Sequence, residues 1–147
     1  MIARQRLAPV IFALAMVTVS GLTGAGDDDE LAPLHAPGAT TIGVDEAKWL
    51  YDEGVVFIDV RNPRLYGRRH IPGAHHLDMK DGFTRETLAA VALKDQPIVI
   101  YSSGIKCRRA HKGAEFAVAW GYQKIYYFRG GMVDWRDVGF PMESGPE

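Results

Sequence analysis

The chain has 147 residues, of which 47% are hydrophobic and 24% are charged, and its formal net charge is −1 at pH 7. This composition is typical of a soluble globular protein rather than a disordered one, and the near-neutral charge gives no indication of nucleic-acid binding, which selects for a basic face. The length is that of one domain, which can bury enough apolar surface to fold without disulfides.

The N-terminal segment, residues 1–25, has the order of a secretory signal peptide. Two arginines form a short basic region, residues 7–19 form an apolar run, and residues 20–26 are mostly small. The apolar run is shorter than the roughly 20 residues that span a bilayer, and its flanks are those of a cleaved signal. We therefore expect cleavage after Ala25 and a periplasmic or secreted protein. The alternative is an uncleaved segment that attaches the protein to the membrane.

The remaining chain is expected to be one domain, residues 41–147, with a flexible lead-in at residues 26–40 that is rich in Gly, Pro, Ala and Asp. In chain order, the apolar patterns and turn residues predict a helix over 45–51, a strand over 55–58, a turn at 71–73, a helix over 84–92, a strand over 97–101, a helix over 108–120, a strand over 124–128 and a helix over 132–138. Strands that alternate with helices of this length indicate an α/β domain built on a parallel sheet, with helices on both faces.

The loop after the strand at 97–101 is the candidate site, because ligands of parallel α/β sheets bind beyond the carboxyl ends of the strands. Its residues are Ser102, Ser103, Gly104, Ile105, Lys106, Cys107, Arg108 and Arg109. Cys107 is the one cysteine of the chain, so no internal disulfide can form. It lies near a predicted helix N-terminus and beside basic side chains, which favours a reactive thiolate. The alternative is an inert, buried cysteine.

Three segments, in order, resemble the rhodanese-like family. Residues 57–63 and 70–74 resemble its block of a strand, Asp-Val-Arg and then His-Ile-Pro-Gly-Ala. The loop after Tyr101 and its following helix resemble the second block, and residues 130–141 resemble the closing block with Gly-Gly, Trp and Gly-x-Pro. The resemblance covers about residues 40–143 and implies a sulfurtransferase on a single α/β domain.

The resemblance also implies a role for the loop. In this family the residue directly after the strand's last tyrosine is the cysteine that accepts sulfur, and loop N–H groups hold the persulfide that forms. Here that position is Ser102, which cannot form a persulfide. The loop resembles a subgroup with the pattern Tyr-Cys-x-Gly-x-Lys-Cys, in which Cys107 corresponds to the second cysteine. A further departure is Arg69, which stands where the family usually has glycine.

Two functions are compatible with these residues. In the first, an exported sulfurtransferase or sulfane-sulfur carrier uses Cys107, takes sulfur from a small thiosulfate-like anion and passes it to cyanide or to a thiol, including that of an acceptor protein. In the second, Ser102 has removed catalysis and the loop binds only an anion or a partner. A phosphatase is a third interpretation, but phosphatases on this fold need their cysteine at the start of the loop.

Other polar residues are expected to have structural roles. Asp59 and Arg61 are expected to pair with each other or with backbone groups where the strand ends, and His70 to support the turn that follows it. His75 and His76 are adjacent in an expected strand, so their side chains point to opposite faces and cannot readily bind one metal ion. The sequence therefore predicts neither a metal site nor a cofactor.

Overall fold

The computed structural model describes residues 30–145, and the predicted signal peptide lies outside these residues. Its centre is a five-stranded sheet in the order β1-β5-β4-β2-β3, in which every neighbouring pair is parallel. The strands are β1 (Thr40–Ile42), β2 (Val56–Asp59), β3 (His75–His76), β4 (Pro97–Tyr101) and β5 (Lys124–Phe128). The helices are α1 (Val44–Asp52), α2 (Pro63–Arg68), α3 (Arg85–Val91), α4 (Arg109–Ala119) and α5 (Gly131–Asp137).

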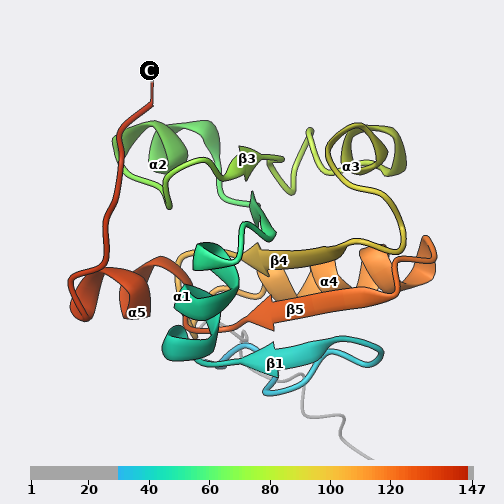
Figure 1. Cartoon of the computed structure of the whole chain (residues 1–147), viewed down its shortest axis with the longest axis horizontal. Helices are drawn as coiled ribbons and strands as arrows, with labels where there is room; N and C mark the ends of the chain where they lie inside the picture. Colours follow the sequence, from blue (N-terminus) through green and yellow to red (C-terminus); the bar gives the residue numbers. More distant parts are fainter. Residues whose placement is uncertain (1–29, 146–147) are drawn as a thin grey trace, which may run out of the picture.

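Two hydrophobic clusters cover the two faces of the sheet. Because successive side chains of a strand point to opposite faces, Ile98 and Ile100 of β4 lie in one cluster. Val99 and Tyr101 of the same strand lie in the other. The first cluster includes residues of α3 and α4, and the second includes residues of α1 and α5. In Figure 1, α1 lies in front of the sheet and α4 behind it. The predicted parallel α/β fold with helices on both faces is therefore confirmed.

The helix predicted over residues 45–51 begins one residue earlier, at Val44, and Gly43 precedes it as the N-cap. Asp45 lies in the first turn, where its negative charge complements the positive end of the helix. The sequence patterns miss β1 and α2. Asn62 caps α2 by accepting a hydrogen bond from the Leu65 N–H at 2.9 Å, but this helix is too short to show a period of 3.6 residues.

No helix within residues 30–145 is long and apolar enough to cross a bilayer. The described part of the predicted lead-in is residues 30–40, of which Thr40 begins β1. Its residues 30–39 make hydrogen bonds to the candidate loop and to the end of β5. The Ala32 N–H donates to the Ile105 carbonyl at 2.7 Å. The Arg129 Nε donates to the Ala32 carbonyl at 2.9 Å, and the Tyr127 hydroxyl donates to the Pro33 carbonyl at 3.1 Å. This segment therefore holds the middle of the candidate loop in place through a hydrogen bond to the Ile105 carbonyl.

Candidate active site

The candidate loop connects the carboxyl end of β4 to the start of α4, where the rule for parallel sheets places a ligand site. Each of residues 103–109 lines one cavity of about 690 Å³, together with Val133 and Asp134 of α5. The structure therefore brings the predicted loop residues together around one space. Ser102 does not line this cavity, because it is only 2% exposed.

The loop folds back so that its cysteine meets its first residue. The Cys107 N–H donates to the Gly104 carbonyl at 2.9 Å, which closes a turn inside the loop. The Cys107 sulfur consequently lies 2.8 Å from the hydroxyl oxygen of Ser102. The Cys107 side chain is partly exposed and lies at the cavity. The one thiol of the chain is thus held beside the position at which the family pattern places its nucleophile.

Three backbone N–H groups of the loop are available as donors. Among residues 30–145, those of Ser103, Gly104 and Ile105 have no hydrogen-bond acceptor. The carbonyls of the same three residues are occupied, since they accept the N–H groups of Val133 at 2.9 Å, Cys107 at 2.9 Å and Ala32 at 2.7 Å, respectively. Consecutive N–H groups without acceptors in such a loop suit an anion.

The charged side chains around the cavity are mostly basic. Nη1 of Arg109 lies 3.9 Å from the Cys107 sulfur, and Arg108 forms an ion pair with Glu30 at 3.1 Å. Lys106 lines the same cavity and is exposed. The thiol also precedes the first turn of α4, whose N-terminal end carries partial positive charge. Both features favour an anion at the cavity.

The pair Gly130-Gly131 allows α5 to approach the loop. Gly131 has φ +53, a left-handed conformation that side chains disfavour. A Cβ at this position would overlap the Ser102 carbonyl oxygen, and one at Gly130 would overlap the Asp134 carboxylate. The absence of a side chain at Gly131 therefore lets the N–H groups of Met132 and Val133 reach the loop carbonyls.

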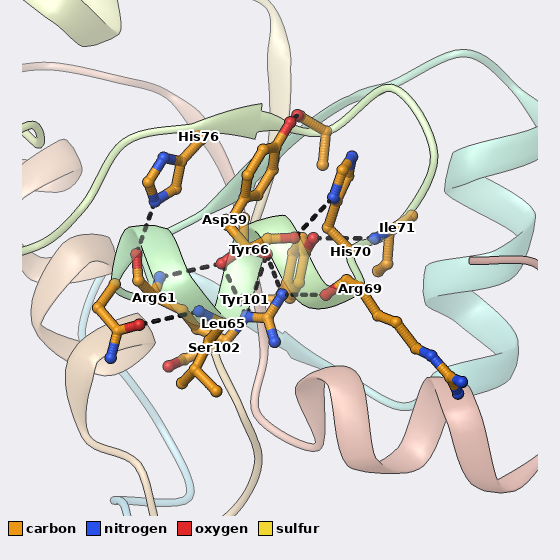
Figure 2. Close-up of polar contacts among 12 residues, drawn as sticks. Asp59, Arg61, Leu65, Tyr66, Arg69, His70, Ile71, His76, Tyr101 and Ser102 are labelled. Carbon is orange, nitrogen blue, oxygen red and sulfur yellow. Dashed lines mark hydrogen bonds and ion pairs between the residues drawn. The ribbon is translucent and has the colours of Figure 1, made fainter. Parts of the chain in front are cut away.

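Asp59 and Arg61 form a buried ion pair, as Figure 2 shows. Nε and Nη2 of Arg61 donate to the two carboxylate oxygens at 2.9 and 2.6 Å, and Nη2 also donates to the Arg69 carbonyl at 2.7 Å. The prediction that these two residues pair with each other or with backbone groups is confirmed, and the structure shows both kinds of contact. Arg69 has φ −163 and ψ 137. The chain is therefore extended at this position and does not need the glycine that the family pattern has there.

Tyr101 and His70 hold the backbone of the neighbouring turn at residues 70–74 in place. Burial raises the pKa of the Tyr101 hydroxyl well above 10.0, and the Asp59 carboxylate raises it further, so the hydroxyl stays neutral and accepts the Ile71 N–H at 3.2 Å. The two ring nitrogens of His70 lie 2.9 Å from the Tyr66 carbonyl and 3.0 Å from Glu143. His70 therefore supports the turn that follows it, as predicted.

The histidines of β3 have different surroundings. His75 is exposed, whereas Nε2 of His76 lies 2.8 Å from the Arg61 carbonyl and its ring stacks on Tyr66. Within the described part of the chain, no group of three or more His, Cys, Asp or Glu side chains is placed to hold a metal ion.

A second cavity was not predicted from the sequence. It contains Arg61, Arg68, Arg69 and Arg136 and shares Ser103 and Val133 with the first cavity. No local pattern joins these arginines, because they come from two segments about 70 residues apart.

The Rhodanese-like domain family model matches residues 43–137. The chain is 31% identical over 106 residues to thiosulfate sulfurtransferase GlpE of Pseudomonas entomophila, a match that covers 70% of this chain and 89% of that protein. Among solved structures, the BH2092 protein of Bacillus halodurans has a TM-score of 0.65 at 22% identity, over 72% of this chain and 77% of that one. A rhodanese of E. coli has a TM-score of 0.50 at 27% identity, over 61% and 98% of the two chains. This chain therefore belongs to the rhodanese-like domain family.

Proposed function

We propose that this protein is an exported sulfurtransferase or sulfane-sulfur carrier in which Cys107, rather than the residue directly after β4, carries the sulfur. The observation that carries the proposal is the contact between the Cys107 sulfur and the Ser102 hydroxyl at 2.8 Å. This contact supports the proposal because the thiol is partly exposed, lines the basic cavity and lies beside the residue that corresponds, by resemblance, to the family's nucleophile. The similarity to proteins named thiosulfate sulfurtransferase GlpE supports a sulfur-containing anion as the donor.

The loading step begins with attack of the Cys107 thiolate on the outer sulfur of thiosulfate. A bond forms between the cysteine sulfur and that outer sulfur, the sulfur–sulfur bond of thiosulfate breaks, and sulfite leaves with the bonding electron pair. Cys107 then carries a persulfide anion, and the total charge is unchanged. In the unloading step a thiolate or cyanide attacks the outer sulfur, and the electron pair returns to the cysteine sulfur.

Ser102 and the loop N–H groups have separate roles in these steps. A thiolate has no proton to donate, so the Ser102 hydroxyl becomes the donor of their hydrogen bond and stabilises the charged sulfur. The N–H groups of Ser103, Gly104 and Ile105 are available for the anionic donor or the persulfide. Arg109, with its guanidinium 3.9 Å from the sulfur, attracts the anion.

Thiosulfate:cyanide sulfurtransferase activity tests this proposal. We expect turnover in the protein that lacks residues 1–25 and background rates in Cys107→Ser. Equal rates in the two proteins would overturn the role of Cys107. The competing function is a binding module without catalysis, which is favoured by the buried serine, 2% exposed, at the nucleophile position. Activity that is absent from the parent and gained in Ser102→Cys, assayed under reducing conditions, would support the binding module.

Export is the second part of the proposal, and it rests on the order of basic, apolar and small residues in 1–25. Fusion of residues 1–30 to a reporter that is active only outside the cytoplasm tests it. We expect reporter activity and a processed product that begins at Gly26. An inactive reporter would contradict export, and an active but unprocessed one would indicate a membrane anchor.

A further inference from the structure

The second cavity, which we call the arginine pocket, has a volume of about 470 Å³ and contains Arg61, Arg68, Arg69 and Arg136. Its remaining lining is mostly apolar and comes from α2, α5 and the C-terminal segment. Ser103 and Val133 line both this pocket and the cavity that contains Cys107. The two spaces are therefore neighbours that share a wall.

The four arginines of the pocket differ in their ion pairs with the described residues 30–145. Arg61 is neutralised by the buried ion pair described above, and Arg136 pairs with Asp137 at 2.7 Å. Among residues 30–145, no carboxylate forms an ion pair with Arg68 or Arg69. In Figure 2 the Arg69 side chain extends away from the buried pair, which engages only its carbonyl. The charge of the pocket thus matches a ligand with two negative charges.

The apolar side chains of the pocket restrict the ligand further. Leu65, Met132, Val133 and Met142 line it next to the arginines. Guanidinium groups bind carboxylates in a planar, bidentate geometry, and apolar side chains bind a carbon skeleton. An organic dicarboxylate satisfies both kinds of lining, whereas an inorganic dianion uses only the arginines.

The shared wall connects such a ligand to the sulfur chemistry. The Val133 N–H donates to the Ser103 carbonyl at 2.9 Å, and the Val133 side chain is 40% exposed. A ligand with its carboxylates at Arg68 and Arg69 can therefore extend a further group across Val133 toward the cavity of Cys107.

We propose that the arginine pocket binds a small organic thiol with two carboxylates and thereby positions it as the sulfur acceptor. This inference rests on the proposed function of Cys107. The acceptor thiolate attacks the outer sulfur of the persulfide and forms a new sulfur–sulfur bond. The bond to the cysteine sulfur breaks, its electron pair returns to Cys107 as a thiolate, and the acceptor leaves as its own persulfide. No external oxidant or reductant is needed.

Binding is tested separately from transfer in the variant Cys107→Ser, which cannot carry sulfur. Succinate is the probe, and the Nε–H signals of the arginines are followed by NMR. We expect saturable shifts that are lost in a variant that also carries Arg68→Ala and Arg69→Ala. The matched control is Arg64→Ala, which removes an exposed charge from the same helix outside the pocket. Shifts that persist without Arg68 and Arg69, or sulfate binding as tight as that of succinate, would overturn the assignment.

Transfer is tested with two acceptor thiols of different charge. Mercaptosuccinate has two carboxylates, and 2-mercaptoethanol has none. In the Arg68→Ala/Arg69→Ala variant we expect KM for mercaptosuccinate to rise about tenfold while KM for 2-mercaptoethanol is unchanged. Equal changes for both thiols would overturn the acceptor role. If neither thiol receives sulfur although succinate binding depends on the two arginines, the proposed sulfur transfer fails with the acceptor role, and the dicarboxylate site stands.

Discussion

The hydroxyl oxygen of Ser102 and the sulfur of Cys107, the first and the sixth residue of the candidate loop, lie 2.8 Å apart. Ser102 is buried and Cys107 is partly exposed, so the hydroxyl supports the sulfur from the protein side. A partly exposed thiol therefore lies within hydrogen-bond distance of the residue that directly follows β4. In the proposed function the serine hydroxyl acts as a hydrogen-bond donor and not as a nucleophile.

Ser102→Ala should lower the rate of sulfur loading roughly tenfold, because the thiolate loses a charge-assisted hydrogen bond worth about 1.5 kcal/mol. Single-turnover loading with thiosulfate measures the effect. The thermal midpoint serves as the control and should change little, since the removed hydroxyl bonds only the cysteine sulfur. A loading rate equal to that of the wild type would show that the hydroxyl does not act on the sulfur.

Gly131→Ala should destabilise the protein by about 2 kcal/mol or more. The added methyl group has two costs: an alanine is strained in the left-handed conformation of this position, and its Cβ clashes with the Ser102 carbonyl. Urea denaturation measures the change. Gly139→Ala is the matched control: its φ is +81 but nothing lies within 4 Å of an added Cβ, so only the conformational part of the cost remains. Equal losses in the two variants would contradict a close approach of α5 to the loop.

Arg61→Met should destabilise the protein by about 3–5 kcal/mol, since it leaves the Asp59 carboxylate buried without its partner. Asp52→Asn breaks the exposed pair with Lys48 and should change stability by less than about 0.5 kcal/mol. Chemical denaturation of both variants provides the comparison. Similar effects of the two substitutions would mean that the buried pair contributes no more to the free energy of unfolding than the exposed pair.

Glu143 gives a prediction for acid pH. Its pKa lies below the ordinary 4.5, first because its carboxylate accepts the Gly73 N–H and also because it contacts His70. A carboxyl group whose pKa is lowered by folding stabilises the fold above its unfolded value and loses this contribution as pH falls through its folded value. The stability advantage of the wild type over Glu143→Gln should therefore be present near pH 5 and decline below about pH 4.

Denaturation curves of the wild type and Glu143→Gln between pH 3 and pH 5 measure this difference. The glutamine side chain of the variant keeps an oxygen that can accept the Gly73 N–H, so the comparison isolates the charge. A difference that does not depend on pH over this range would contradict the lowered pKa.

The central strands of the sheet could be predicted because their burial is visible in the local pattern of apolar residues. The strand at 97–101 is a continuous apolar run, the strand at 124–128 is apolar after Lys124, and their predicted bounds equal those of β4 and β5. In contrast, β1 has three residues and is exposed at its first position, so its strand character depends on pairing with β5. A local pattern cannot contain that information.

The candidate loop could also be predicted, but its internal geometry could not. The position after Tyr101, the single cysteine and the basic side chains are visible in the sequence. The contact between the first and the sixth residue of the loop requires the turn that the Gly104 carbonyl closes, together with the N–H groups of α5. The arginine pocket is harder still, because it depends on the packing of α2 against a distant part of the chain.

Mass spectrometry of the protein after incubation with thiosulfate tests the role of Cys107 most directly. We predict the gain of one sulfur atom on the peptide that contains Cys107, its loss on addition of cyanide, and no gain in Cys107→Ser. An unmodified Cys107 peptide under conditions that load an active rhodanese, or a sulfur atom found on another residue, would contradict the role of Cys107 as the sulfur carrier.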